Sequence, residues 1–164
     1  MSISLEISTK QVNELVDKAV ALRATGPLMH RIGQIMVDDT RLNFRASKGP
    51  DGTPWAPLKH RKGKPLNDTR RLRNSIDYEV SANGEEVYIG TNVVYAPVHQ
   101  FGHTVKPKTP GGKLKIPTGN GEFAFVDSVV IPARPFIGIK ARQVNKINKV
   151  INVWAEGVLN RGST

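Results

Sequence analysis

The 164-residue chain contains no cysteine, so it can form neither a disulfide nor a thiolate nucleophile. Aromatic residues make up only 6%, which predicts a mainly aliphatic core. No apolar run approaches the roughly 18 residues that a membrane-spanning helix needs. The opening residues, MSISLEIS, lack the basic and apolar regions of a signal peptide. These absences predict a soluble intracellular protein without membrane contact, and the length suits a single domain over residues 1–164.

Sequence patterns of common catalytic centres are absent as well. The chain has no HExxH zinc motif, no GxSxG nucleophile turn and no GxxxxGK[ST] phosphate loop. Two pairs of adjacent acids, Asp38–Asp39 and Glu85–Glu86, are expected at the solvated surface. On a strand, Glu85 and Glu86 would face opposite sides and would not easily share a proton. We therefore predict no enzymatic activity, no catalytic residue and no cofactor.

Acidic residues are outnumbered, and the net charge of +10 is unevenly distributed. Residues 41–75 have a net charge of +8, because they hold ten Lys or Arg against two acids. Residues 76–100 hold four acids and no Lys or Arg, so their net charge is −4. Residues 101–118 and 140–164 each add +4. Basic segments beside an acidic one suit either nucleic acid or another copy of the chain.

The N-terminal part predicts a short strand and two helices. Apolar and polar residues alternate over residues 2–8, as they do in a strand. A capping box at Ser8 and Gln11 would then begin a helix that ends at Gly26–Pro27. A second helix is predicted from Pro27 to Arg45. The expected buried faces contain Val12, Leu15, Val16, Ala19 and Val20 in the first helix and Leu28, Ile32, Ile35, Met36 and Leu42 in the second.

Residues 46–75 change character, because prolines, glycines and basic residues disfavour long regular elements there. The GPDG sequence predicts a turn with Pro50 and Asp51 at its centre. Residues 68–76, DTRRLRNSI, predict a short helix capped by Asp68 or Thr69.

The rest of the chain alternates between strand patterns and loops. Two alternating runs around Asn83-Gly84 predict a β-hairpin, and residues 104–122 predict a mobile or functional loop. Residues 122–139 return to a strand pattern that Pro132 and Pro135 end. The last helix, over residues 140–160, has an apolar face of Val144, Ile147, Ile151, Trp154 and Val158. The predicted class is α+β, with a small antiparallel sheet packed with two N-terminal helices and one C-terminal helix and with long basic loops.

The stretch YAPVHQFGH places His99 and His103 four residues apart. A zinc site normally needs three or four protein ligands, and Gly102 disfavours one unbroken helix through both histidines. A metal-dependent hydrolase using these two histidines is therefore the weaker alternative. The simpler interpretation is that Tyr95, Val98 and Phe101 pack inward, while His99 and Gln100 hydrogen-bond nearby backbone.

The basic stretch over residues 59–73, KHRKGKPLNDTRRLR, is the main alternative to a purely protein-binding role. Such a segment can neutralise phosphates without reading sequence. Aromatic rings that would stack on bases are missing from it, and Trp55 is the nearest. Two hypotheses remain open, a basic nucleic-acid-binding module and a surface that binds acidic protein.

Three motifs in series resemble the phage virion morphogenesis family, which contains tail completion proteins of Mu-like and related tailed phages. They are GPDGTPWAPL over residues 49–58, YAPVHQFG over 95–102 and IPARPFIGI over 131–139, and the resemblance covers nearly the whole chain. The family pattern before the hairpin often reads L-x-x-T-G-x-L-R, whereas this chain has Arg70 at the glycine position. The YAPVHQFG motif is then an element of the fold rather than an active site.

The resemblance implies a structural protein that completes the tail at its head-proximal end, so that the tail joins the filled head. Related tail terminator proteins form rings on the six-fold tail tube. The implied partners are other copies of the chain in a ring, for example a hexamer. The tail tube and head-tail connector proteins are further implied partners. Non-specific contact with passing DNA is a further hypothesis. The implied location is the virion tail, after assembly in the host cytoplasm.

A ring needs one surface that binds a different, complementary surface on its neighbour. We predict that the basic 59–73 segment binds the acidic hairpin of the next subunit. Loop 104–122 is expected to become ordered when subunits dock. The prolines around Arg134 are expected to hold its guanidinium for a bidentate contact with a carboxylate. The predicted interface residues are Arg70, Arg71, Arg73, Glu79, Glu85, Glu86 and Arg134; the predicted structural residues are Trp55, Tyr95, His99, Phe101, Gly102, Pro132, Pro135 and Phe136.

Overall fold

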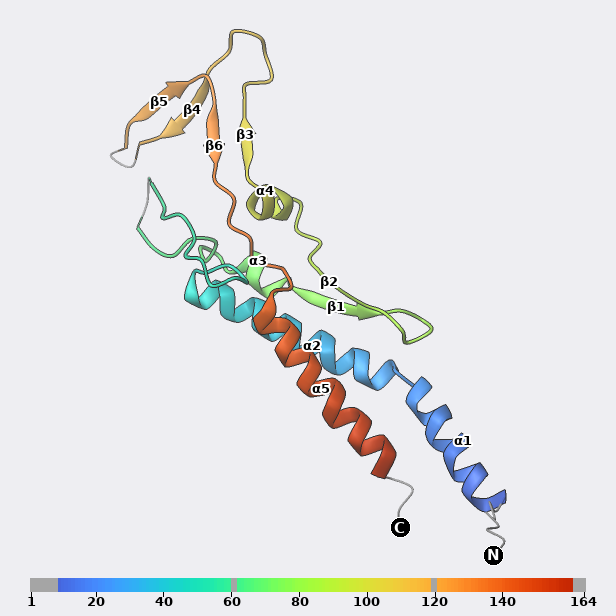
Figure 1. Ribbon diagram of the computed structural model, residues 1–164. Helices are drawn as coiled ribbons and strands as arrows, with labels where there is room; N and C mark the ends of the chain where they lie inside the picture. Colours follow the sequence, from blue (N-terminus) through green and yellow to red (C-terminus); the bar gives the residue numbers. More distant parts are fainter. Residues whose placement is uncertain (1–8, 60–61, 119–120, 161–164) are drawn as a thin grey trace, which may run out of the picture.

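The computed structural model describes residues 9–59, 62–118 and 121–160. The predicted strand over residues 2–8 and the Ser8–Gln11 capping box lie outside the described parts. The molecule is elongated, and helices α1, α2 and α5 fill one half of its length (Figure 1). Strands β3 to β6, within residues 103–131, extend from the opposite end and are called the arm below. The α+β class predicted from the sequence is confirmed.

Three long helices form at the predicted places. Helix α1 spans Thr9–Arg23, α2 spans Gly26–Ala46 and α5 spans Ala141–Asn160. Pro27 lies in the first turn of α2, where its missing N–H costs nothing. Gly33 lies inside α2 without interrupting it. Its missing side chain leaves room for the Tyr78 ring of the hairpin, which a Cβ at this position would meet.

The strands pair in three separate two-stranded antiparallel ladders rather than in one sheet. Strand β1 (Asp77–Val80) pairs with β2 (Val87–Gly90) as the predicted hairpin, and this hairpin packs on α2. Strand β3 (His103–Val105) pairs with β6 (Val129–Ile131). Strand β4 (Leu114–Pro117) pairs with β5 (Phe123–Val126). Two short helices, α3 (Arg71–Asn74) and α4 (Ala96–Phe101), complete the fold.

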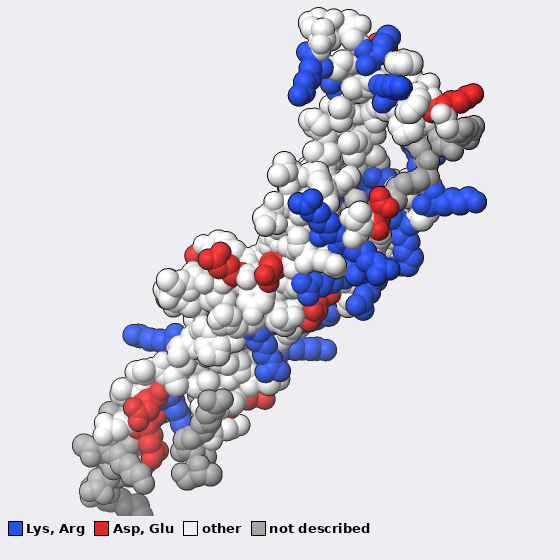
Figure 2. Space-filling model, turned by 180° about the vertical axis from the view of Figure 1, so that it is seen from behind, with Lys and Arg blue, Asp and Glu red and all other residues white. Residues whose placement is uncertain are grey.

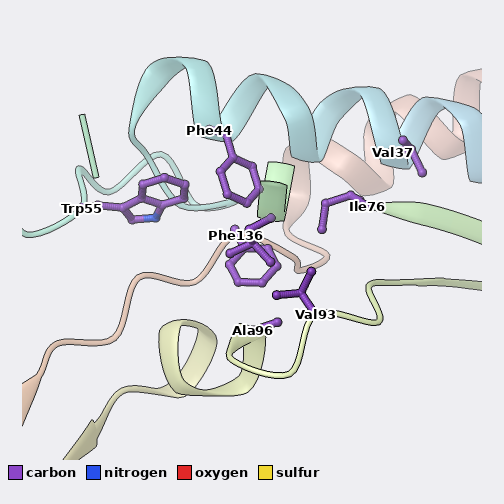
Figure 3. Packing of buried hydrophobic residues seen from close by; sticks show 8 residues of the cluster. Val37, Phe44, Trp55, Ile76, Val93, Ala96 and Phe136 are labelled. Carbon is purple, nitrogen blue, oxygen red and sulfur yellow. The ribbon is translucent and has the colours of Figure 1, made fainter. Parts of the chain in front are cut away.

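The main hydrophobic core lies beneath the C-terminal half of α2 (Figure 3). Phe44 is fully buried at its centre, with ring centroids 5.4 Å from Trp55 and 5.2 Å from Phe136. Phe136 follows Phe44 by 92 residues and Trp55 by 81, so this packing joins the first third of the chain to its C-terminal part. The remaining buried members of this core are Val37, Leu72, Ile76, Val93 and Ala96.

A second core joins α2 to α5, where Val150 packs against Leu28, Ile32 and Met36. A buried polar cluster continues this contact. Asp39 is only 2% exposed, and it accepts hydrogen bonds from Arg142 at 2.9 Å, from Gln143 at 2.6 Å and from Lys146. The solvated surface predicted for Asp39 is therefore wrong, since three side chains of α5 surround its carboxylate. Asp38, its neighbour, is exposed as predicted.

The predicted apolar faces of the helices are correct only in part. In α2 the predicted Leu28, Ile32 and Met36 are buried, whereas Leu42 is exposed. In α5 the buried face is turned by about one residue, because Gln143 and Val150 are buried and the predicted Val144 and Ile151 are exposed. In α1, Val16 and Val20 are exposed although this helix contacts α5. Sequence periodicity therefore predicted where the helices form, but it predicted only part of the buried face of each helix.

Candidate interaction surfaces

The irregular segment over residues 46–75 is fixed to the core by Trp55. The predicted GPDG turn forms, with the Gly52 N–H donating to the Gly49 carbonyl at 2.9 Å. The Trp55 indole is 7% exposed, and its Nε1 donates to the Pro135 carbonyl at 2.8 Å. The segment then folds back on the end of α2, where the side chains of Lys64 and Asn67 donate to the carbonyls of Arg45 and Phe44. These bonds satisfy carbonyls that the last turn of a helix leaves free.

Arg134 was predicted to contact a partner, but its side chain is buried within the chain. Its side chain is 6% exposed, and its Nε and Nη2 donate to the backbone carbonyls of Ala56 and Pro57 at 2.8 and 3.2 Å. Burial lowers the pKa of its guanidinium. The expected contact with a partner carboxylate stays a prediction, because Arg134 still lines a hollow with Arg70, Arg71 and His99. Arg134 also ties the IPARPFIGI motif to the segment that carries Trp55, and Pro135 contributes the carbonyl that Trp55 uses.

Arg70, Arg71 and Arg73 lie at the surface around α3, as predicted for a partner-binding segment. Arg70 precedes the helix in the left-handed conformation, with φ of +60°. This is the position at which the family pattern often has glycine, so the turn keeps its geometry with an arginine in it. Thr69 Oγ1 accepts a hydrogen bond from the Arg71 N–H at 3.3 Å. A hollow of about 340 Å³ here is lined by Arg45, Lys64, Asn67, Arg70 and Arg73.

The acidic hairpin lies toward the other end of α2. Its tip packs against the α1–α2 junction, where Thr25 Oγ1 donates to the Gly84 carbonyl at 2.8 Å. Gly84 has φ of +71°, and a Cβ there would come within 3.0 Å of Gly26 Cα, so the close approach requires glycine. The turn is longer than the two residues that Asn83-Gly84 suggests, since the Ser81 N–H donates to the Glu86 carbonyl.

The basic and acidic groups therefore lie far apart within one chain. Glu85 and Glu86 are exposed at the hairpin tip, which lies at the first turn of α2. Glu79 is also exposed, but it lies in β1 and lines a hollow with Arg41 and Asn74. The arginine cluster lies at the last turn of α2, which is 21 residues or about 30 Å away along the helix. Figure 2 shows a dense group of Lys and Arg on one side of the middle of the molecule and an acidic group on the opposite side.

The YAPVHQFG motif forms the short helix α4 and the turn after it. Gly102 has φ of +76°, and a Cβ there would lie 2.9 Å from the Ala133 nitrogen, so only glycine fits between α4 and β3. The Gln100 side chain accepts from the N–H groups of Phe136 and Ile137 and donates to the Ile137 carbonyl, as predicted. Phe101 and Tyr95 were expected to pack inward, but both are exposed, Phe101 by 77%.

The two histidines lie on different elements, because α4 ends before Gly102 and His103 begins β3. The His99 carbonyl accepts from the Arg134 N–H at 2.7 Å, and its ring packs edge-on against Tyr95 at 5.7 Å. Burial, and then the charge of Arg134, lower the pKa of His99. In the described parts of the chain, no three acidic or histidine side chains gather as metal ligands would. None of the described helices combines the length and hydrophobicity needed to cross a bilayer.

The predicted mobile loop over residues 104–122 is largely built into the arm. It contains the end of β3 and all of β4, which pairs with β5. The predicted strand over residues 122–139 divides into β5 and β6, and Pro132 directly follows β6. Strand β5 pairs with β4, and β6 pairs with β3, so both partner strands come from the region that was predicted to be a loop.

One surface went unnoticed in the sequence, a groove between the end of the hairpin and α4. Its volume is about 470 Å³, and its floor contains the core residues Val93, Ala96 and Phe136. Val94 and Phe101 stand at its edge. Phe101 was expected to pack inward and Val94 carried no expectation, so only their exposure in the structure identifies the groove.

Comparison with known proteins agrees with the motifs. Residues 6–155 match the model of the phage virion morphogenesis family. The chain is 37% identical over 139 residues to Mu-like prophage FluMu G protein 2 of Haemophilus influenzae, an alignment that covers 82% of this chain and 83% of that protein. No solved structure matches the chain.

Proposed function

Because the chain belongs to the phage virion morphogenesis family, and thus has a structural role in building the virion, we propose that it completes the phage tail at its head-proximal end. There it forms a ring of identical subunits, for which six-fold symmetry would match the tail tube. The ring provides the surface to which the head-tail connector binds. In this role the protein acts by binding neighbours and not by catalysis.

The separation of the two charged groups supports this proposal most directly. The arginines near α3 and the two glutamates of the hairpin tip, Glu85 and Glu86, lie at opposite ends of α2, well beyond the roughly 8 Å over which charges act at physiological salt. They do not neutralise each other within one chain. Placed side by side, two copies can set the basic group of one against the acidic group of the next. Repeating this contact closes a ring when the rotation per subunit fits.

Electron microscopy of particles made without this protein tests the proposed role. The account predicts filled heads and separate tails, or tails of abnormal length, and restoration of joined particles when the wild-type chain is supplied from a plasmid. Abnormal tail length would indicate a terminator, while normal free tails would indicate a connector. Normal joined particles in the absence of the protein would rule out the proposal.

A charge reversal tests the side-by-side contact. Changing Arg70, Arg71 and Arg73 together to Glu should abolish complementation with little change in the thermal unfolding midpoint, because Arg70 and Arg71 are exposed and Arg73 is only half-buried. Changing Glu79, Glu85 and Glu86 to Lys in the same chain should restore joined particles. The matched control changes Arg31 and Lys149, which are exposed on α2 and α5, to Glu. Failure of the second triple change to restore assembly would argue against direct pairing.

A nucleic-acid-binding role is the second candidate. The basic hollow formed by Arg45, Lys64, Arg70 and Arg73 supports it, since four cations around one depression can neutralise a phosphate backbone. In that case the triple arginine change would leave self-association intact and abolish salt-dependent binding to random DNA. The two candidates therefore predict opposite results for the same variant.

A further inference from the structure

The tip of the arm carries an exposed aromatic face. Phe123 and Phe125 are both exposed, Phe125 by 65%, although phenylalanine is usually buried in a folded domain. Across the ladder, Phe125 pairs with Lys115 and Phe123 pairs with Pro117, so these four side chains share one face. Lys115 Nζ lies 4.0 Å from the centroid of the Phe123 ring. The face is therefore both apolar and positively charged.

The apolar groove beside α4 has matching properties. Its lining is contributed by residues 91–101 and by Phe136 and Ile137, and Val94 at its edge is 94% exposed. Thr91 and Asn92 line this groove and also the adjoining hollow, which contains Asp77 and Glu79 and one cation, Arg41, that donates to the Ile76 carbonyl. An apolar floor next to carboxylates suits an aromatic side chain that arrives together with lysines.

The segments that carry the two surfaces lie on opposite sides of the same molecule. In Figure 1 the β4–β5 ladder leans to the left, on the side of the 46–75 segment, whereas the chain leading from β2 to α4 runs on the right, on the side of the hairpin. The left side thus carries the arm tip and the basic segment. The right side carries the groove and the acidic hairpin.

We propose that the groove of each copy receives the Phe123–Phe125 face of the β4–β5 ladder from the next copy. The basic arm then lies along the acidic hairpin of that neighbour, in the same direction as the contact between the basic 59–73 segment and the hairpin. This contact is head-to-tail, and it would close the ring of the proposed function, on which the inference rests. It also gives a reason for an arm that buries few of its large apolar side chains.

The absence of cysteine makes this contact directly testable. A chain carrying both Phe125→Cys and Val94→Cys is supplied from a plasmid to phage lacking the protein, and the assembled particles are mildly oxidised. Covalent multimers of this chain should appear on non-reducing gels, and their largest size should equal the ring's copy number. Each single change alone should give none. The control pairs Phe125→Cys with Val20→Cys, since Val20 is also an exposed valine, at 61%, but lies on α1.

Three results would overturn the inference. Phe125→Cys linked to itself would indicate a two-fold symmetric contact, and linkage to another virion protein would indicate that the groove holds a different partner. Particles that assemble normally without any linkage would show that the arm lies elsewhere. A different result would overturn the proposed function itself, namely normal joined particles from phage that lack the protein. A second variant, Phe123→Ser with Phe125→Ser, should lose complementation while its unfolding midpoint stays that of the wild type.

Discussion

The body around α2 contains both buried hydrophobic clusters, whereas none of the described residues of the arm belongs to either of them. Phe44, Trp55 and Phe136 form a closed core, and the buried Asp39 carboxylate is surrounded by three donors from α5. In the arm, Phe123, Phe125 and Val130 are exposed, and the strands pair only with one another. The body can therefore hold its shape alone, whereas the arm exposes the side chains that an interface would bury.

The largest difference between the two regions should appear when one aromatic residue is removed from each. Trp55→Ala should lower the free energy of unfolding by about 3–5 kcal/mol, because it removes a buried indole and its hydrogen bond to Pro135. Phe125→Ala in the arm should change it by less than about 0.5 kcal/mol. Chemical denaturation of both variants measures this directly. Equal losses would show that the arm belongs to the same cooperative core.

Removal of one charge from the α2–α5 contact should have the next largest effect. Asp39→Asn should cost about 1–3 kcal/mol, because buried hydrogen bonds from Lys146, Gln143 and Arg142 are weakened. Asp38→Asn is the matched control, since that side chain is exposed and should be nearly neutral. Similar losses in both variants would contradict the assigned difference in burial.

The same carboxylate gives the body a pH dependence. Burial alone would raise the pKa of Asp39, but hydrogen bonds from Lys146 and Gln143 and the charges of Arg142 and Lys146 outweigh it and lower that pKa below 3.8. The unfolded chain therefore takes up the proton first as pH falls. The stabilisation from Asp39 is fully present above about pH 4 and is lost as pH falls through the folded-state pKa. Denaturation curves of Asp39→Asn should show a weaker dependence below pH 4 than those of wild type.

The smallest predicted effect concerns the turn before α3. Arg70 holds φ of +60°, a conformation that disfavours side chains, so Arg70→Gly should stabilise the protein by about 0.5–1 kcal/mol. Arg73→Gly, inside the short helix, should destabilise it instead. A rise in the unfolding midpoint for the first variant and a fall for the second would support this strain. If both glycine variants lose stability, the backbone of Arg70 is not strained.

Sequence patterns identified what depends on neighbours along the chain. The three long helices, the hairpin around Asn83-Gly84 and the GPDG turn formed where local spacing and turn residues predicted them, whereas α4 was not predicted. The burial of Trp55 in its motif also agreed with the expected structural role.

Contacts between distant segments explain what the sequence missed. The pairing of β3 with β6 joins residues about 25 positions apart, and no turn signal specifies it. Arg134 looked exposed because arginine usually is, yet the carbonyls of Ala56 and Pro57 satisfy it internally. Phe101 looked buried because phenylalanine usually is, and its exposure depends on how α4 packs. In both cases the tertiary contact overrides the general preference of the residue type.

The most direct test of the division between body and arm is a cryo-electron microscopy map of the tail's head-proximal end in mature particles. The account predicts a ring of this chain in which each β4–β5 ladder lies against residues 91–101 of the neighbouring subunit, with each body unchanged. A ring whose arms point away from neighbouring copies would contradict the assigned contact. Absence of the chain from that end of the tail would contradict the proposed role itself.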